Sequence, residues 1–262
     1  MSLRWAILGS GSKANSYMFQ TETGAVCVDA GYPLRTLRKR ADRAGMDASK
    51  IQTVFLTHSH GDHIRGLAPL LEETRATLVH RNGLKLRSFL PQDPTETLAV
   101  ESKTSYEQRG CHFFPFDLYH DAPCATGYHF KIGGTRFTLI TDTGKTDEGM
   151  LHLAARADVL FLEANYCPQM LAAGPYPPLL RERVSSDLGH LSNHQASDFL
   201  NVLSDRKRQD PSSVLVKSVY LVHLSANNNS PEQVQQTLAQ TCRWSGPIRI
   251  CDRDELVMGE VN

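Results

Sequence analysis

Short runs of apolar and β-branched residues alternate with longer amphipathic stretches along most of the chain. Residues 51–56, 159–162 and 219–222 are such short runs, and each one ends at polar residues. Runs of this length and composition predict buried strands. The stretches between them space their apolar residues three or four positions apart, which predicts helices. Strands that alternate with helices are typical of an α/β protein.

The rest of the chain extends this alternation. One segment differs, because residues 168–187 include Gly174 and several prolines without clear periodicity, and we expect a loop or flap there. We expect further strands over 3–8, 16–19, 26–29, 77–79, 97–100 and 248–250, an extended run over 111–119, a hairpin of 127–132 with 135–141, and helices over 33–44, 64–73, 83–89, 147–156, 193–207 and from Pro231 onward.

Side chains of the kinds that bind metal ions are concentrated directly after the strand over 51–56. His58, His60, Asp62 and His63 lie within six residues. Alternate side chains of an extended chain point the same way, so we expect His58, His60 and Asp62 to converge, with His63 turning inward as a helix begins. Imidazole and carboxylate ligands suit Zn²⁺, Mn²⁺ or Fe²⁺. Four such groups exceed what one catalytic ion needs from one segment, which favours two adjacent ions.

Acidic residues and histidines also follow several other predicted strands. His120, Asp142, Glu163 and His223 each stand at the C-terminal end of an apolar run, as His58 does. Ligands of α/β proteins bind at that edge of the sheet. We therefore expect one site that is built from distant segments.

Composition and charge change this picture little. The 262 residues show no shift that would mark a domain boundary, so we expect a single domain over 1–262. The sequence has 28 Lys and Arg residues and 28 Asp and Glu residues. The net charge therefore does not attract a polyanion, and only a local basic patch could bind one. The candidate patches are Arg35, Arg38, Lys39, Arg40 and Arg43 on one predicted helix, and Arg181 with Arg183.

The cysteines point to a reducing compartment. There are six, without a Cys-x-x-Cys pair, and Cys27 and Cys251 sit in apolar runs, which indicates reduced thiols. We found no apolar run that approaches a membrane span and no signal-peptide pattern at the start of the sequence. We therefore expect a cytoplasmic protein without membrane association, and the sequence indicates no protein partner or oligomeric state.

The ordered set of site residues resembles the metallo-β-lactamase-fold hydrolases. It comprises His58-x-His60-x-Asp62-His63, with Asp29 before it and His120, Asp142 and His223 after it. Three further motifs resemble the exonuclease-like YycJ branch, namely Ser10-Gly11-Ser12, Gly189-His190-Leu191-Ser192-Asn193 and His223-Leu224-Ser225. Glu163-Ala164 with His190 is similar to an element of ribonuclease Z, although Asn165 stands here in place of its threonine.

The resemblance implies a four-layer αβ/βα sandwich of two mixed sheets flanked by helices. It also implies two divalent ions, Zn or Mn, with Fe as a further candidate. His58, His60 and His120 would hold the first ion, Asp62, His63 and His223 the second, and Asp142 would bridge them. Asp29 would support the backbone of the metal loop.

The expected reaction is phosphodiester hydrolysis by a hydroxide that bridges the two ions, with DNA favoured over RNA. Asp62 would orient or deprotonate the nucleophile. His190, held by Glu163, would donate a proton to the leaving oxygen, because a neighbouring carboxylate keeps an imidazole protonated.

Three other functions remain open at this stage. The first is hydrolysis of a small molecule such as a thioester, lactone, β-lactam or cyclic phosphodiester. The second is a redox enzyme in which the same ligands hold two irons. The third, a binding module without catalysis, fits a complete ligand set least well.

Overall fold

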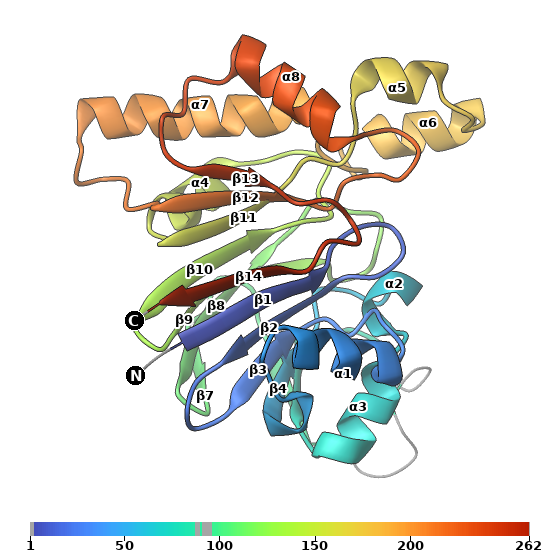
Figure 1. Cartoon of the computed structure of the whole chain (residues 1–262), viewed down its shortest axis with the longest axis vertical. Coiled ribbons are helices and arrows are strands. Elements are labelled where there is room, and N and C mark those ends of the chain that lie inside the picture. Colours follow the sequence, from blue (N-terminus) through green and yellow to red (C-terminus); the bar gives the residue numbers. More distant parts are fainter. Residues whose placement is uncertain (1–2, 87–89, 91–95, 262) are drawn as a thin grey trace.

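Two seven-stranded mixed sheets face each other, and helices cover their outer faces (Figure 1). The computed structural model describes residues 3–86, 90 and 96–261. In sheet order, the first sheet contains β14 (Val257–Val261), β1 (Leu3–Gly9), β2 (Ser16–Gln20), β3 (Ala25–Val28), β4 (Ile51–Phe55), β5 (Thr77–Arg81) and β6 (Thr97–Val100). The second contains β13 (Ile248–Ile250), β12 (Ser218–Val222), β11 (Val159–Glu163), β10 (Thr135–Ile140), β9 (Thr126–Ile132), β8 (Cys111–Asp117) and β7 (Tyr106–Gln108).

Each sheet has a parallel part and an antiparallel part. Strands β3 to β6 pair in parallel, and so do β10 to β13. The parallel strands therefore end at one edge of each sheet, and the polar residues after β4, β10, β11 and β12 come together there. The strand expectations are right in position to within about two residues, apart from β7 and β14, for which the sequence reading proposed no strand.

The helices separate into groups that cover different parts of the molecule. Against the first sheet lie α1 (Leu34–Arg43), the short η1 (Ala48–Lys50), α2 (Gly61–Ile64) and α3 (Leu67–Thr74). Against the second lie α4 (Glu148–Ala155), α7 (Asn193–Gln209) and α8 (Pro231–Thr241), and α5 (Pro168–Ala173) and α6 (Pro178–Ser185) form a pair beside the site.

Among the described residues, three large apolar clusters occupy the spaces between these layers, and a smaller one packs α5 against α6. The central one joins the facing sheets through buried rings, among them Phe19, Phe55, Phe130, Phe137 and Phe161. The ring centroids of Phe19 and Phe130 lie 4.8 Å apart with the planes at 84°, an edge-to-face contact that stabilises such cores. A second cluster joins the first sheet to α1 and α3, and a third joins the second sheet to α4, α7 and α8.

The expectation of a loop over 168–187 is wrong, because the segment forms α5 and α6. Pro168 and Pro178 occupy the first turns of these helices, where proline lacks only an N–H that has no intrahelical partner. The prolines that suggested a loop therefore mark helix starts.

The expected helix over 64–73 is also different. It begins earlier, at Gly61, and is broken between α2 and α3 at Gly66. A Cβ at Gly66 would lie 2.0 Å from the carbonyl oxygen of Tyr32, so only glycine fits this close approach. Of the helix expected over 83–89, residues 87–89 lie outside the described residues, and 83–86 form a turn and irregular chain.

We found no helix in the described part of the chain that is long and apolar enough to span a membrane. The single domain expected over 1–262 stays a prediction.

Candidate metal centre

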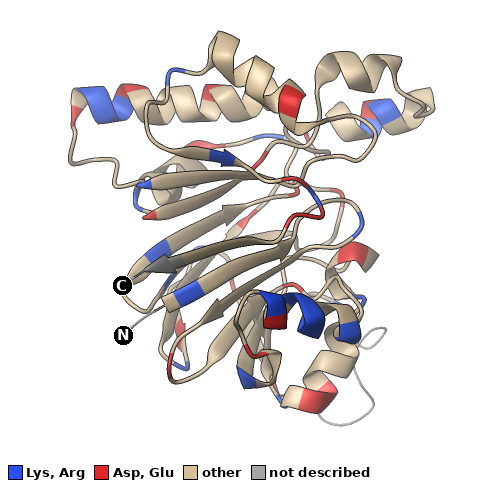
Figure 2. Cartoon of the chain, in the orientation of Figure 1, with Lys and Arg blue, Asp and Glu red and all other residues tan. Residues whose placement is uncertain are grey.

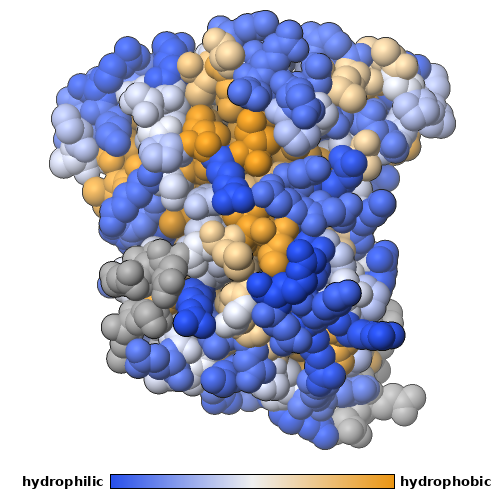
Figure 3. All heavy atoms as spheres, viewed as in Figure 1, coloured by the Kyte–Doolittle hydropathy of each residue, from blue (hydrophilic) through white to orange (hydrophobic). Residues whose placement is uncertain are grey.

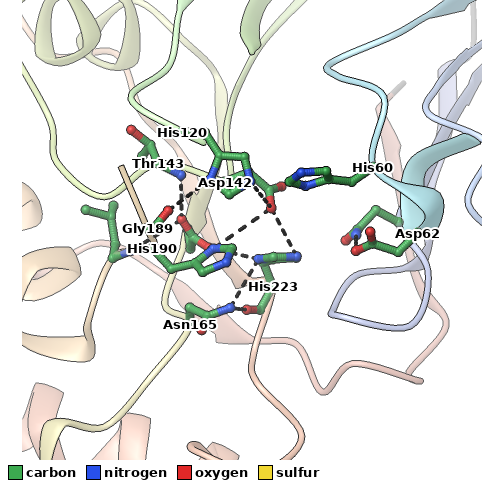
Figure 4. Close-up of polar contacts among 12 residues, drawn as sticks. His60, Asp62, His120, Asp142, Thr143, Asn165, Gly189, His190 and His223 are labelled. Atoms are coloured by element: carbon green, nitrogen blue, oxygen red, sulfur yellow. Dashed lines mark hydrogen bonds and ion pairs between the residues drawn. The ribbon is translucent and has the colours of Figure 1, made fainter. Parts of the chain in front are cut away.

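The site lies at the edge where the parallel strands of both sheets end, and the seven side chains of the predicted ligand set come together there. Figure 4 shows five of them, namely His60, Asp62, His120, Asp142 and His223. Potential ligand atoms of His58, His60 and His120 lie within 4.8 Å of one another, and so do those of Asp62, His63 and His223. Asp142 stands between the two triplets. One of its carboxylate oxygens is 3.9 Å from Nε2 of His120 and 3.5 Å from Nε2 of His223, and the other is 3.6 Å from Nε2 of His63.

One expectation about the metal loop is wrong. Asp62 does not converge with His58 and His60 along an extended chain, because α2 already begins at Gly61. The helical turn directs Asp62 toward His63, with 3.6 Å between Oδ2 and Nε2. The amide nitrogen of Asn15 contacts both side chains, at 3.2 Å from Oδ2 of Asp62 and 3.0 Å from Nε2 of His63.

The buried atoms of this site fit a bound cation. Nε2 of His58, His120 and His223 and Oδ2 of Asp142 are buried without a hydrogen-bond partner among the residues that the structure describes. Buried polar atoms normally have partners, since leaving one unpaired costs about 1–3 kcal/mol. Four such atoms in one place are lone-pair donors of the kind that Zn²⁺ or Mn²⁺ accepts.

The other ring nitrogen of most of these histidines is held by an acceptor. Nδ1 of His63 donates to Oδ2 of Asp29 at 2.8 Å, and Nδ1 of His120 donates to the carbonyl oxygen of Gly189 at 3.1 Å. Nδ1 of His223 donates to Oε1 of Glu163 at 2.8 Å. When an acceptor holds the Nδ1–H group, the free lone pair of the ring is on Nε2 and faces the site. This is the usual arrangement around metal-binding histidines.

Asp29 supports the metal loop directly. Its Oδ1 accepts from the backbone N–H of Thr57 at 2.9 Å, and its Oδ2 accepts from the hydroxyl of the same residue at 2.8 Å. Together with the bond to His63, these contacts attach both ends of the loop to one carboxylate. The supporting role implied by the resemblance is therefore consistent with the contacts.

Glu163 binds two histidines at once, which the sequence did not reveal. Its Oε1 accepts from Nδ1 of His190 at 2.7 Å as well as from His223, and its Oε2 accepts from the backbone N–H groups of Thr143 and Leu191. His223 is 2% exposed, whereas His190 is 21% exposed and lines a cavity with Ser12 and Arg183. Of the two histidines, His190 is thus the one that a substrate can reach.

The electrostatics favour carboxylates that stay ionised. Burial raises the pKa of Asp142, but His223, His63 and the other imidazoles outweigh burial and bring that pKa well below its ordinary value. Burial likewise opposes ionisation of Glu163, yet His190 and His223 leave its pKa below the usual range. Both buried carboxylates are therefore ionised, and each is compensated by neighbouring imidazoles.

Burial and charge act in opposite directions on the histidines. Burial lowers the pKa of His58 well below its ordinary value, and neighbouring His63 adds to the effect. Burial also lowers the pKa of His63, but Asp29 and Asp142 outweigh it and raise the value to about 9. The corresponding contacts of His223 with Asp142 and Glu163 raise its pKa to about 10.

Three site residues have an unusual backbone conformation. Asp29, Asp142 and His223 have φ angles of 58°, 58° and 61°, in the left-handed region that residues other than glycine seldom adopt. Each residue follows a strand of the parallel part of its sheet. Such conformations cost about 1–3 kcal/mol each and are concentrated at functional sites.

Sequence reasoning assigned no role to Asp121. Its Oδ1 lies 3.5 Å from Nε2 of His120 and 3.8 Å from Nε2 of His60, and its other oxygen pairs with Arg183. The adjacency to His120 in the sequence was the available signal. Asn165, which stands where ribonuclease Z has threonine, donates through Nδ2 to the carbonyl oxygen of His223 at 2.9 Å.

The histidines outside the predicted set stay outside the site. His80, His112, His129 and His152 belong to none of the groups that could hold a metal within the described ranges.

Comparison with known proteins gives the family. A model described as the beta-lactamase superfamily domain matches residues 25–224. The chain belongs to the beta-lactamase superfamily. The exodeoxyribonuclease WalJ of Streptococcus pneumoniae is 28% identical over 244 residues, which cover 91% of this chain and 87% of that protein. The exodeoxyribonuclease YycJ of Bacillus anthracis is 27% identical, over 94% of this chain and 91% of that protein.

A solved structure supports the same fold. The metallo-beta-lactamase fold protein YhfI from Bacillus subtilis has a TM-score of 0.72 with this chain at 17% identity, and the match covers 99% of this chain and 100% of that one. The expected fold and the expectation of a hydrolase of this superfamily are confirmed. The His and Asp clusters are able to bind divalent metal ions.

Proposed function

We propose that this enzyme is a dinuclear metal-dependent phosphodiesterase that degrades nucleic acid as an exonuclease, with DNA favoured over RNA. The observation that supports this most directly is the Glu163–His190 pair, which lies beside the convergent ligand atoms and faces a cavity. The two relatives named exodeoxyribonuclease, which match over nine-tenths of this chain, support DNA as the substrate.

In this proposal two ions, Zn or Mn with Fe as a further candidate, would be bound by the two triplets. His58, His60 and His120 would hold one ion, Asp62, His63 and His223 would hold the other, and Asp142 lies between the two triplets as the shared ligand. Bound ions would supply an activated water and polarise the phosphoryl oxygen. Asp62, whose Oδ2 accepts from Asn15, orients the attacking water.

His190 holds the proton that the leaving oxygen needs. Its Nδ1 donates to Oε1 of Glu163 and the ring lines the cavity, so in this proposal Nε2 passes the proton to the leaving oxygen. The hydrogen bond from Nδ1 to Glu163 fixes the orientation of this imidazole ring. This arrangement supports a substrate whose leaving group is a poor one, such as the sugar oxygen of a nucleotide.

The test compares His190→Ala with the parent on two substrates. We expect hydrolysis of DNA to fall by about 10²–10⁴-fold, because a general acid contributes about that much. Hydrolysis of bis(p-nitrophenyl) phosphate should change by less than about tenfold, because its leaving group needs little protonation. His152→Ala, on α4, is the matched control, and metal content is measured for each protein.

Two results would contradict the proposal. A protein that binds two equivalents of metal and degrades neither end-labelled DNA nor RNA, single- or double-stranded, is not a nuclease, and activity on a lactone or thioester would then favour the small-molecule alternative. Equal rates for His190→Ala and the parent on DNA would remove His190 from the reaction. A cytoplasmic location remains part of the proposal and is consistent with six free cysteines.

A further inference from the structure

One face of α1 presents a row of positive charges to solvent. Leu37 and Ala41 are buried against the first sheet, and Arg35, Lys39 and Arg43 are exposed on the opposite face. These three residues are four positions apart and therefore form one stripe along the helix. Figure 2 shows α1 as a concentration of basic residues, and Figure 3 shows a strongly hydrophilic surface over the same helix.

The stripe is not neutralised by the protein itself. Arg38, on the flank of the helix, pairs with Glu73, and Arg40 donates to the backbone carbonyl oxygens of Leu8 and Asp254. Arg35, Lys39 and Arg43 have no ion-pair partner within the described part of the chain. Of the basic patch that the sequence suggested, these three remain available to a ligand.

Two more cations continue the stripe toward the metal loop. Lys13 and Arg65 are exposed, and Nη1 of Arg65 lies 3.4 Å from the carbonyl oxygen of Lys13. Lys13 is two residues from Asn15, whose amide contacts Asp62 and His63, and Arg65 is two residues from His63. These cations therefore border the candidate metal centre.

The path of the backbone connects the two groups of cations. The N–H of Gly31 donates to the carbonyl oxygen of Asn15, and α1 begins three residues later, at Leu34. At the other end, Gly45 accepts from Arg4 near the start of β1, which is the end of that strand remote from the site. Arg35 is thus the stripe residue nearest the site and Arg43 the farthest.

On the opposite side of the site, the structure describes one further pair of basic residues, on α6. There α6 approaches the metal loop, and Arg183 is engaged by Asp121. Arg181, the other basic residue of this second patch, donates to the carbonyl oxygen of Ala172. Hence Arg183, the member of this second patch that lines the cavity, has its charge paired within the protein.

We propose that the nucleic acid strand leaves the metal centre over Lys13 and Arg65 and lies along α1, with its phosphates on Arg35, Lys39 and Arg43. We call these five residues the α1 basic track. The stripe extends about 12 Å at 1.5 Å per residue, so its three cations can each meet a separate phosphate of one strand. This inference rests on the proposed function, because it states the path that the nucleic acid substrate of the same site takes across the protein surface.

The test removes the three stripe charges together, as R35Q/K39Q/R43Q. The metal-loaded protein is titrated with a hydrolysis-resistant phosphorothioate DNA strand at several salt concentrations, followed by fluorescence anisotropy. Each phosphate contact contributes about 0.7 to the slope of log affinity against log salt for a single strand, so we expect the slope to fall by about 2. KM for a long DNA strand should rise at least about tenfold, with kcat and the KM of a dinucleotide unchanged.

The matched control removes the same number of charges elsewhere, as K207Q/R208Q/K217Q. Lys207 and Arg208 lie in the last turn of α7, which Figure 1 shows on the other side of the two sheets from α1, and all three residues are exposed. This control should retain the salt slope and the KM of the parent. Melting temperatures of both variants show whether folding is preserved.

The outcomes separate this inference from the function that it rests on. If the parent cleaves DNA and the α1 variant has the parent's slope and KM, the α1 basic track is wrong and the nuclease proposal stands. The parent could bind DNA without cleaving it, while the α1 variant, unlike the control variant, shows a reduced salt slope. In that case the nuclease proposal is wrong and the binding surface stands. A parent that neither cleaves nor binds DNA overturns both.

Discussion

At the scale of single residues, Asp29 shows how one buried carboxylate organises the candidate site. It accepts two hydrogen bonds from Thr57 and one from His63, and it is 1% exposed. Residues with this role around a metal site typically change metal affinity by about 10–100-fold when they are replaced. Its contribution should therefore appear in metal binding.

We expect Asp29→Asn to lower metal affinity by about 10–100-fold, because the amide keeps one acceptor oxygen and turns its NH2 group toward a donor of Thr57 or His63. Titration of the metal-free protein in competition with a chromophoric chelator measures the affinity. Asp210→Asn, at an exposed carboxylate beyond α7, is the control. Unchanged affinity in Asp29→Asn would show that His63 needs no such support.

At the scale of secondary-structure elements, Asp158 connects β10 with β11. Its carboxylate accepts from the backbone N–H and from Nε of Arg136, each at 3.0 Å, and Nζ of Lys217 lies 3.1 Å away. Burial raises the pKa of Asp158, but the contacts with Arg136 and Lys217 outweigh burial and lower it to about 2. The ionised form therefore stabilises this pair of strands.

We expect Asp158→Asn to reduce the free energy of unfolding near pH 7 by about 1–2 kcal/mol, less than the pKa shift alone implies because water screens the exposed Lys217. The folded pKa lies below the unfolded value of about 4, so the contribution is present above pH 4 and is lost as the pH falls toward 2. Urea denaturation at stepped pH measures this. Asp42→Asn, exposed on α1, is the control, and a pH-independent difference for Asp158→Asn would contradict the argument.

Two local patterns in the sequence predicted the wrong secondary structure. The number of prolines between residues 168 and 187 suggests a loop. Two of them, however, occupy the first turns of α5 and α6, where proline is compatible with a helix. In the metal loop, the alternation of His58, His60 and Asp62 suggests an extended chain, whereas the helix begins at Gly61 and redirects Asp62. Both errors arise because a short motif does not show where the next element begins.

At the scale of the whole molecule, the candidate ligands come from both sheets. His58, His60 and His63 follow β4 of the first sheet, whereas His120, Asp142 and His223 follow strands of the second. Ions bound among them would connect the two sheets. Binding to the folded state alone stabilises it, by about 4 kcal/mol when the free metal is 1,000 times the dissociation constant.

We expect removal of metal by a chelator to lower the melting temperature by about 10 °C, at about 2–4 °C per kcal/mol for a protein near this size. Thermal melts followed by circular dichroism, before and after Zn²⁺ or Mn²⁺ is restored, measure the change. His58→Ala should melt at a lower temperature and respond little to the chelator. A parent that loses its metal without a shift in melting temperature would show that the ions do not connect the sheets.

The sequence by itself determined the features that are local. Short apolar runs identified most strands, because burial of a strand requires apolar residues in an unbroken or alternating run. The ligand set was readable because metal-binding side chains follow those runs at the sheet edge. Family membership followed from the order of the same residues.

Only the tertiary structure decided how distant residues meet. Glu163 is shared between His190 and His223, Asp121 faces His60 and His120, and Asp29, Asp142 and His223 adopt left-handed backbone angles. The α1 basic track likewise depends on which cations remain unpaired after folding. Such contacts are made by packing between segments far apart in the chain, and no local pattern records which partner a side chain finds.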